Sequence, residues 1–346
     1  MNDINIRKTG RAGRITLTRP KALNALSYDM CLAIEAAVDD WREDPGVAVI
    51  VLDAEGEKAF CAGGDVAQLY ETGQSGDYAF ARRFWADEYR LNNKLHGYPK
   101  PVISFMQGFT MGGGVGLGCH GSHRVVGETS KIAMPECGIG LVPDVGGSLL
   151  LAQAPGRLGE YLGTTGARMG PGDVLHAGFA DYFITETEWP ALIAQLEENG
   201  DPFILDKAAT PPPAGELADL QTEIDHLFAG ETLNAVIAAV TTAKSDFAAE
   251  TLKILRRGSP LSMACTLEML RRLRGPGIGM IPALQQEYRY TWRAMEHGDF
   301  IEGVRAAIID KDRSPKWQHH GDVPQSDVDA MLAPLGDNDL NLEENT

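Results

Sequence analysis

The sequence predicts an α/β fold with at least partly parallel strands and a helical C-terminal extension. Strand-like and helix-like segments alternate through the first half of the chain, and helix patterns dominate after a run of three prolines at 211–213. Such alternation favours parallel pairing, because each helix returns the chain to the start of the next strand. The 346 residues are enough for one large domain or about two ordinary ones.

The first half carries the alternating elements. Residues 14–18 alternate polar and apolar side chains, as a half-buried strand does. Ser27 is a suitable N-cap for a helix whose apolar residues recur at positions 30, 34, 38 and 41. Residues 47–52 form an unbroken apolar run, typical of a strand buried on both faces. A polar-rich helix at 79–95 and strands at 101–106 and 123–126 complete the order.

The second half is mainly helical. Periodicity predicts helices at residues 216–228, 232–247, 261–272, 281–295 and 300–309. We assign the apolar stripe of Met263, Leu267 and Leu270 to the core rather than to a binding groove. The chain is thus divided into a core, residues 1–205, a helical region packed on it, residues 214–318, and an acidic flexible tail, residues 319–346. Residues 336–346 hold four acids and no base, so we expect a solvated, frayed end.

Composition narrows the class of partner and compartment. The net charge of −17, from 31 basic and 48 acidic residues, argues against a nucleic-acid partner. No apolar run approaches the roughly 18 residues that span a bilayer, and residues 1–14 are too polar for a secretory signal. Five cysteines without a CxxC motif argue against a disulfide framework. We therefore expect a cytoplasmic protein that does not bind membranes.

Two glycine-rich segments offer backbone amides to a ligand. Phe60–Asp65 follows a buried-type strand, and its adjacent glycines let a ligand approach the amides closely, although a plain turn is the alternative. Gly108–Gly118 follows another strand and precedes a predicted helix. Amides at a helix N-terminus lack intrahelical partners and suit a developing negative charge. Close packing against a neighbouring element is the alternative for this second segment.

A third segment, Met134–Gly147, places two carboxylates, Glu136 and Asp144, eight residues apart among apolar residues, glycines and prolines. Apolar surroundings disfavour the charged form of a carboxyl group and prepare it for acid–base or nucleophilic work. Alternatively, Asp144 caps a helix that begins near Gly147. A cap does not explain Glu136.

Three other interpretations receive little support. Gly116, Gly118 and Gly121 have the spacing of a dinucleotide fingerprint, but Gly116 lies ten residues beyond the strand end at Met106. Cys119, His120 and His123 lack a second ligand pair for zinc. Cys61 has no identifiable base that would make it a nucleophile. We therefore predict neither a metal nor a separate cofactor.

Together these segments resemble the crotonase (enoyl-CoA hydratase/isomerase) superfamily over about residues 10–318. The resemblance lies, in order, in Arg19–Ala25, Phe60–Asp65, Gly108–Gly116, Pro135–Glu136 and Pro143–Gly147. Toward the C-terminus, the sequence is similar to the 3-hydroxyisobutyryl-CoA hydrolase branch at Ser259–Ser262, Glu287–Tyr290 and Gly303–Trp317. The resemblance implies a crotonase-like fold of repeated ββα units with a helical C-terminal extension.

The resemblance also implies a set of site residues. An acyl-CoA thioester would place its carbonyl oxygen between the amides of Gly64 and Gly113, an oxyanion hole. Glu88 matches a substrate-contacting position, although a solvated helix acid is the alternative. The implied CoA contacts are Lys21 and Ala22 near the phosphates and adenine, and Ala62, Asp65 and Val66 along the adenine and pantetheine pocket.

One departure from the hydratase pattern favours a hydrolase. Hydratases of the superfamily usually carry a second catalytic glutamate after the glycine run, and Gly116 takes that position here. Asp144 stands where hydratases commonly have glycine. The resemblance thus implies hydrolysis of a short 3-hydroxyacyl-CoA thioester, a 3-hydroxyisobutyryl-CoA hydrolase-like step of valine catabolism, with Glu136 and Asp144 as the acid pair. The alternative within the same fold is an enoyl-CoA hydratase or isomerase.

Other expectations follow from the same resemblance. CoA enters as part of the substrate, and the superfamily commonly forms trimers or dimers of trimers, so we expect a homo-oligomer, a trimer or a hexamer. A non-catalytic acyl-CoA binder would bind without turnover, and the intact pair of Glu136 and Asp144 argues against it. A dehydrogenase is the weakest alternative.

Overall fold

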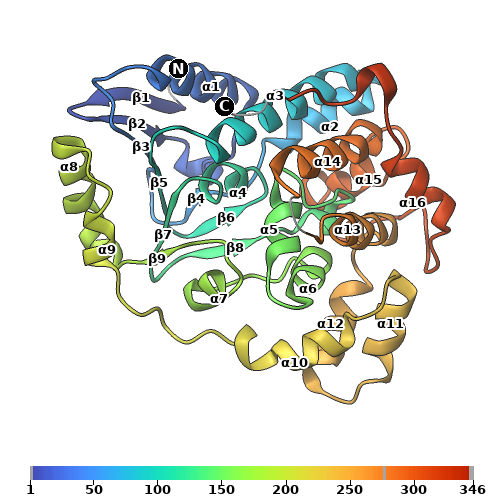
Figure 1. Ribbon diagram of the computed structural model, residues 1–346. Helices are drawn as coiled ribbons and strands as arrows, with labels where there is room; N and C mark the ends of the chain where they lie inside the picture. Colours follow the sequence, from blue (N-terminus) through green and yellow to red (C-terminus); the bar gives the residue numbers. More distant parts are fainter. Residues whose placement is uncertain (1–2, 276–277, 343–346) are drawn as a thin grey trace.

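Two sheets form the centre of the computed structural model, which describes residues 3–275 and 278–342 (Figure 1). The larger sheet has the order β1-β2-β3-β5-β7-β9, and the smaller one the order β4-β6-β8. All pairings between neighbouring strands are parallel except the antiparallel β1–β2 hairpin. The strands are β1 Ile4–Thr9, β2 Ala12–Leu17, β3 Val49–Ala54, β4 Ala59–Cys61, β5 Val102–Met106, β6 Phe109–Met111, β7 His123–Val126, β8 Lys131–Ala133 and β9 Tyr182–Phe183.

Helices surround the sheets. Those of the first two thirds are α1 Tyr28–Arg42, α2 Val66–Gln74, α3 Tyr78–His96, α4 Gly113–Gly118, α5 Gly147–Gln153, α6 Leu158–Thr165, α7 Pro171–His176, α8 Trp189–Asn199 and α9 Ile204–Ala208. Those of the last third are α10 Leu217–Leu227, α11 Leu233–Thr242, α12 Asp246–Leu255, α13 Pro260–Arg272, α14 Met280–Ala294, α15 Phe300–Val304 and α16 Gln325–Leu332. Short turns of tighter or wider helix include η1 Pro20–Ala22, η2 Glu136–Ile139 and η4 Arg305–Ile309.

The predicted elements of the first half are confirmed. The strands at 14–18, 47–52, 101–106 and 123–126 correspond to β2, β3, β5 and β7, which pair in parallel. Ser27 caps α1, since its hydroxyl accepts a hydrogen bond from the Met30 amide at 3.3 Å. The helix expected at 79–95 is α3. The α/β class with parallel strands is therefore correct.

The predicted helices of the second half are also present, with two breaks. The helix expected at 232–247 is two helices, because Ser245 caps α12 and accepts from the Ala248 amide at 3.0 Å. The helix expected at 300–309 is α15 followed by the π-helical turn η4. The segment with three prolines is an extended connection between α9 and α10.

The helical region shares one hydrophobic core with the first half. α13 packs on α5 and α6, and α14 packs on α3. Tyr89, Tyr290 and Phe300 are fully buried in this cluster, as are Met269 and Leu270. Met263 and Leu267 are buried as well, so the stripe assigned to the core is confirmed. A smaller cluster covers the other face of the large sheet, where the rings of Phe105 and Trp189 meet at a tilt with their centroids 5.4 Å apart.

The C-terminal tail packs on the molecule, so the expectation of a flexible, frayed end is wrong for the described residues 319–342. α16 buries Val328, Met331 and Leu332 against α13 and α14. Asp339 pairs with Arg289 of α14 at 2.9 Å, and Leu340 is buried. One of the acids that suggest solvation, Asp339, is therefore held by an arginine instead. Glu343 and Glu344 lie outside the described residues.

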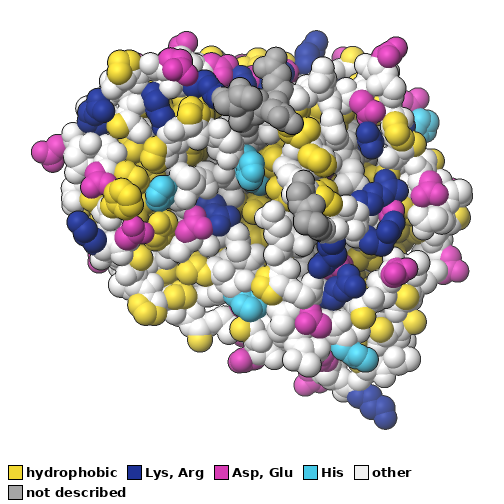
Figure 2. All heavy atoms as spheres, viewed as in Figure 1, with side chains coloured by type: hydrophobic (Ala, Val, Ile, Leu, Met, Phe, Trp, Pro, Cys, Tyr) yellow, Lys and Arg dark blue, Asp and Glu magenta, His cyan; other side chains and the backbone are white. Residues whose placement is uncertain are grey.

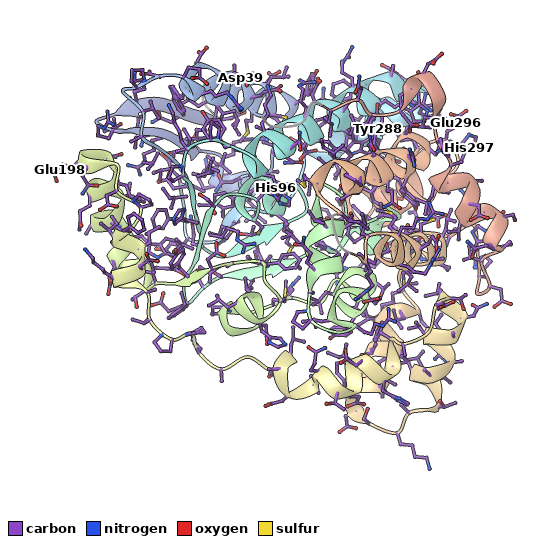
Figure 3. All side chains as sticks on the ribbon, viewed as in Figure 1. Asp39, His96, Glu198, Tyr288, Glu296 and His297 are labelled. Carbon is purple, nitrogen blue, oxygen red and sulfur yellow. The ribbon has the colours of Figure 1, made fainter. Side chains whose placement is uncertain are left out.

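The surface carries both signs of charge. On the face shown in Figure 2, acidic and basic side chains are interspersed. Figure 3 shows Glu296 and His297, just beyond the end of α14, on the opposite side of the molecule from Glu198 on α8. Within residues 3–275 and 278–342, no helix is long and apolar enough to cross a membrane. The five cysteines are free thiols, and each is buried.

Candidate active site

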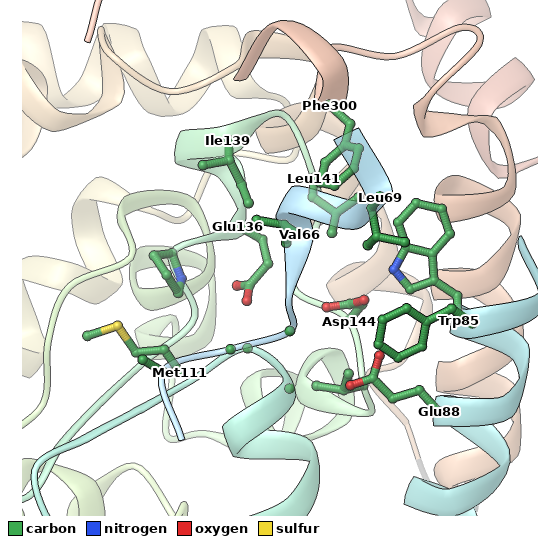
Figure 4. Close-up of a pocket in the computed structure, with 18 of the residues that line it drawn as sticks. Val66, Leu69, Trp85, Glu88, Met111, Glu136, Ile139, Leu141, Asp144 and Phe300 are labelled. Atoms are coloured by element: carbon green, nitrogen blue, oxygen red, sulfur yellow. The ribbon is translucent and has the colours of Figure 1, made fainter. Parts of the chain in front are cut away.

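The three strands of the small sheet deliver the predicted chemistry to one place. β4 leads into Gly63 and Gly64, β6 into Gly112 and Gly113, and β8 into Glu136. Because β4, β6 and β8 run parallel, their carboxyl ends meet at one edge of the sheet. A cavity of about 220 Å³ opens at this edge and is closed on its other sides by α2, α3, the loop before α5, α15 and η4 (Figure 4).

Two glycine pairs form one wall of the cavity. A Cβ atom on Gly113 would lie 3.3 Å from the amide nitrogen of Gly64, so the two segments touch. Gly112 has a φ of 49° and no room for a side chain, because a Cβ there would lie 2.8 Å from Glu136 Oε1. In the part of the chain that the structure describes, the amides of Gly64 and Gly113 have no hydrogen-bond acceptor. The structure thus brings together two unpaired backbone donors beside a carboxyl group.

The second glycine segment lines the cavity at one residue and packs closely against its neighbours at others. Gly113 opens α4 at the cavity. Gly114 and Gly118 serve close packing, because Cβ atoms there would lie 2.0 Å from the Cys61 carbonyl oxygen and 2.5 Å from Met106 Sδ. The glycines that let α4 approach β4 therefore also hold the Gly113 amide next to that of Gly64.

Glu136 and Asp144 line the same cavity and are both buried. Figure 4 shows their carboxyl groups directed into one space. The hydroxyl of Tyr89 donates to Asp144 Oδ2 at 2.7 Å, which fixes that carboxyl from α3. Glu136 Oε2 is buried and has no hydrogen-bond partner among the described residues. An unpaired buried acceptor of this kind is costly unless a ligand completes it.

The two carboxyl groups keep their protons more tightly than carboxyl groups in water. Burial raises the pKa of Asp144 to about 7. Burial also raises the pKa of Glu136 well above its usual range, and the nearby charge of Asp144 adds to this rise. Loss of hydration of the charged form accounts for the rise at Asp144, whereas at Glu136 repulsion between two like charges adds to it. Such shifts are typical of acid–base groups in active sites.

Asp144 does not cap α5, so the alternative for this residue is wrong. The N-cap position is Gly146, and the amides of Gly146 and Ser148 donate to the carboxylate of Glu287 instead. No site role for Glu287 is evident from the sequence alone. One feature of the sequence nevertheless distinguishes it: Glu287 is an acidic residue on the apolar face of the predicted helix at 281–295, the face that also carries Leu284 and Thr291.

Glu88 lies against the same wall and is not a solvated helix acid. It is 4% exposed, and its Oε1 has no hydrogen-bond partner within the described ranges. A Cβ on Gly113 would lie 2.8 Å from this oxygen, so the Glu88 carboxyl reaches the glycine wall. Burial raises the pKa of Glu88 to about 8, and the charge of Asp144 contributes.

The position of the second hydratase glutamate is closed. A Cβ on Gly116 would lie 2.7 Å from Asn92 Nδ2 and 2.9 Å from the Cβ of Val145. Separations below about 3 Å require the neighbouring atoms to move, so an acidic side chain does not fit here without displacing α3 or the loop before α5. The missing acid is therefore a property of the packing as well as of the sequence.

The predicted CoA contacts fall into two groups. Ala62 and Val66 line the cavity. Lys21 and Ala22 lie outside it, exposed on η1, which adjoins the site because the Ala62 amide donates to the carbonyl of Leu23 at 3.0 Å. Asp65 does not line the cavity either, and its carboxylate pairs with Arg19 at 3.1 Å. The structure thus brings two of the five residues to the cavity itself.

The alternative chemistries find no support in the geometry. Burial raises the pKa of Cys61 to about 12, so this thiol stays protonated. His120 Nε2 donates to the carbonyl of Val145 at 2.7 Å, and burial lowers its pKa to about 3. Within the described residues, no group of three or more His, Cys, Asp or Glu side chains is placed to hold a metal. Gly116 and Gly118 lie inside α4 rather than directly after a strand, unlike a dinucleotide fingerprint.

Comparison with known proteins agrees with these features. The family model described as enoyl-CoA hydratase/isomerase matches residues 12–332. The mitochondrial 3-hydroxyisobutyryl-CoA hydrolase of Gallus gallus is 38% identical over 98% of this chain and 91% of its own length. The Homo sapiens protein of the same name is 37% identical over 98% of this chain and 90% of its own length.

Two solved structures match over almost the whole chain. An enoyl-CoA hydratase from Rhodobacter sphaeroides 2.4.1 is 56% identical with a TM-score of 0.94, covering 98% of this chain and 100% of the other. A carnitinyl-CoA dehydratase from Mycobacterium thermoresistibile is 38% identical with a TM-score of 0.94, covering 99% of both chains. The crotonase-like fold and its helical C-terminal extension are therefore confirmed.

Proposed function

Because the chain belongs to the enoyl-CoA hydratase/isomerase family, we propose that it hydrolyses the thioester bond of a short 3-hydroxyacyl-CoA, with 3-hydroxyisobutyryl-CoA as the first candidate. One observation carries this proposal: a buried acid pair, Glu136 and Asp144, lies opposite two unpaired glycine amides in one cavity. Such a hydrolase would serve valine catabolism. CoA enters as part of the substrate, so we propose no separate cofactor or metal.

An enoyl-CoA hydratase or isomerase is the second candidate, favoured by the similarity to the enoyl-CoA hydratase from Rhodobacter sphaeroides 2.4.1. Hydration of a double bond needs water activated near the β-carbon, and hydrolysis needs attack at the carbonyl carbon. The closed space at Gly116 speaks against the extra acid that hydratases of this family use. The curated relatives over nearly the full chain carry the hydrolase name, which supports the first candidate.

In the proposed mechanism, the amides of Gly64 and Gly113 donate to the thioester oxygen as it gains negative charge. One such donor is typically worth about 3 kcal/mol in the transition state. Glu136 acts at the carbonyl carbon, and Asp144 orients the water or the substrate hydroxyl and accepts a proton. Glu88, whose protonated carboxyl has an unpaired oxygen at the wall, contacts the acyl group.

Two routes fit this arrangement. In the covalent route, the Glu136 carboxylate attacks the carbonyl carbon, the CoA thiolate leaves and takes a proton, and water then cleaves the mixed anhydride. In the direct route, Glu136 removes a proton from the water that attacks. Single turnovers in oxygen-18 water test the covalent route: label in the Glu136 side chain supports the anhydride, because in the direct route the label enters only the acid product.

The function is tested by release of free CoA across a panel of acyl-CoA thioesters. We expect thiol release from 3-hydroxyisobutyryl-CoA and no loss of enoyl absorbance from crotonyl-CoA. The reverse pattern supports the hydratase. Binding of acyl-CoA without any turnover would instead identify a non-catalytic binder.

Replacement of Glu136 by glutamine tests the leading residue. We expect the Glu136→Gln variant to lose about 10²–10⁴-fold in kcat, because the amide is neither nucleophile nor base. CoA affinity and the unfolding temperature should stay near those of the wild type, since the side chain keeps its shape. Thiol release at the wild-type rate would remove Glu136 from the mechanism.

Assembly and location complete the proposal. We propose a homo-oligomer, a trimer or a hexamer, as is common in the superfamily, and light scattering behind a sizing column gives the mass that tests it. We propose a cytoplasmic location, which five buried thiols fit. The relatives named above carry the word mitochondrial in their names. Fractionation of the native host decides between the two compartments.

A further inference from the structure

The turn that follows Asp144 is strained. Val145 has a φ of 54° and Gly146 a φ of 79°, so two successive residues adopt left-handed conformations. For a β-branched residue such as valine this is unfavourable by about 1–3 kcal/mol. Strain of this kind persists only where the surroundings determine the conformation from several sides. Contacts from other elements must therefore hold this turn.

Glu287, on α14, holds the Val145–Gly146 turn through hydrogen bonds. Its Oε2 accepts from the Gly146 amide at 2.8 Å, and its Oε1 accepts from the Ser148 amide at 3.1 Å and from the Ser148 hydroxyl. The side chain is 0% exposed, and it is separated from the turn by about 140 residues of sequence. His120 secures the other side of the turn, because its Nε2 donates to the carbonyl of Val145 at 2.7 Å. The strained segment is therefore fixed by two distant elements.

The same turn determines where Asp144 lies. Tyr89 holds the carboxyl of Asp144 from α3, and Glu287 holds the backbone just beyond it. Glu287 does not line the cavity, so it does not meet the substrate itself. Glu287 nevertheless affects the site, because its charge contributes to the raised pKa of Glu136. Burial raises the pKa of Glu287 to about 8 against three hydrogen bonds that lower it, and Asp144 contributes to the rise.

An ordinary helix cap is a weaker explanation of Glu287. A cap is usually supplied by the N-cap side chain itself, and here that residue is Gly146, which has none. One of the two amides bound by Glu287 belongs to the left-handed residue of the turn rather than to the helix. The bonds of Glu287 thus act on the turn as well as on α5.

We propose that Glu287 is a positioning residue that holds Asp144 in the cavity by fixing the Val145–Gly146 turn. This inference rests on the proposed function. It predicts that loss of the Glu287 acceptors slows the chemical step while leaving substrate binding largely intact, because Asp144 moves and the glycine wall does not.

The first test compares two carboxylates that each bind an amide at the start of a helix. In Glu287→Gln, the amide group presents a donor where an oxygen accepts, so the turn loses part of its support. We expect kcat for thioester hydrolysis to fall at least about ten-fold, with KM changed by less than about three-fold. Asp225 accepts from the Arg157 amide at 2.6 Å at the start of α6, so Asp225→Asn is the matched control and should keep its kcat.

A second test asks whether Glu287 acts through Asp144. The rate of the Asp144→Ala variant is slow and is measured with enzyme in excess over substrate. Adding Glu287→Gln to this variant should lower the rate by less than about two-fold. If the role of Glu287 is purely structural, Glu287→Gln will lower the rate by the same factor in the wild type and in Asp144→Ala, and this result would overturn the proposal. So would a folded Glu287→Gln variant with wild-type kcat.

Two outcomes remain to be distinguished. If Glu287→Gln fails to fold, Glu287→Asp replaces it, because aspartate keeps both acceptor oxygens but withdraws them by one methylene. A reduced kcat with little change in KM in folded Glu287→Asp supports the proposal, and full kcat overturns it. A wild-type protein that hydrolyses none of the thioesters overturns the proposed function together with this inference, whereas an active wild type with fully active variants contradicts the inference alone.

Discussion

At the scale of single residues, the site is a collection of carboxyl groups that hold their protons near neutral pH. Burial raises the pKa of Asp144 to about 7 and those of Glu88 and Glu287 to about 8. Ionised carboxylates are needed for attack on a thioester or on water. We therefore expect hydrolysis to accelerate as the pH rises through neutrality, because the reactive form of the acid pair becomes populated there.

The same residues predict how stability depends on pH. A carboxyl whose pKa is raised in the folded state binds a proton that the unfolded state has already released, so stability falls with rising pH. This contribution is fully present below the ordinary pKa values, 3.8 for Asp144 and 4.5 for Glu88, and is lost as the pH rises through the folded values of about 7 and about 8. Thermal unfolding midpoints should decline across that window. Glu88→Gln removes one such group and should flatten the decline, and an unchanged slope would contradict the role given to its burial.

At the scale of elements, the contact between α4 and β4 sets the geometry of the proposed oxyanion hole. A Cβ on Gly114 would lie 2.0 Å from the carbonyl oxygen of Cys61. The carbonyl group belongs to the backbone and cannot move aside as the end of a flexible side chain can. Any side chain at position 114 therefore pushes the start of α4 away from the Gly63–Gly64 segment. The two donors would then no longer meet at one oxygen.

Gly114→Ala is therefore expected to cost about 1–3 kcal/mol in unfolding free energy, as overpacking usually does, and to lower kcat more than it raises KM. The free energy is measured by denaturant unfolding and the kinetics by thiol release. Gly170→Ala is the matched control, because a Cβ there meets nothing within 4 Å. Equal behaviour of the two variants would show that the close approach of α4 does not matter.

The elements also show what the sequence could predict. β2, β3, β5 and β7 are apolar or alternating runs long enough to recognise, and α1, α3, α13 and α14 have clear periodicity. The small sheet was missed because β4, β6 and β8 have three residues each, too few to establish a period of two. β1 was missed because only its first residue is buried.

The sequence predicts those residues of the site that have a local signal and misses those defined by contacts between distant segments. Glu136, Asp144 and the glycine pairs stand out locally, as acids among apolar residues and as clustered glycines. Glu287 could not be placed, since its partners Gly146 and Ser148 are about 140 residues away and only tertiary packing joins them.

At the scale of the whole molecule, the helical region is part of the same core as the catalytic half. α14 packs on α3, which carries Glu88 and Tyr89, and also on α16. Asp339 and Leu340, beyond α16, add an ion pair and a buried side chain. The acidic C-terminal segment therefore supports the helix that bears Glu287.

Removal of residues 325–346 should consequently destabilise the protein and lower its activity. Val328, Met331, Leu332 and Leu340 lose their burial, at about 1.5–3 kcal/mol for each fully buried large side chain as an upper bound. Arg289→Gln is the control for the ion pair alone and should cost no more than about 1 kcal/mol. A truncated chain with wild-type unfolding temperature and kcat would contradict the supporting role of this segment.

Every turnover of a thioester hydrolase brings an acylating thioester into the molecule, and the packing of this protein keeps its own thiols from reacting with it. Burial raises the pKa of Cys61, Cys119 and Cys137 to about 12 and those of Cys31 and Cys265 well above the usual value. Protonated and covered sulfur neither captures the acyl group of a thioester nor exchanges with a disulfide. Alkylating reagents should likewise leave the native chain unmodified, so their uptake would report on the opening of the fold.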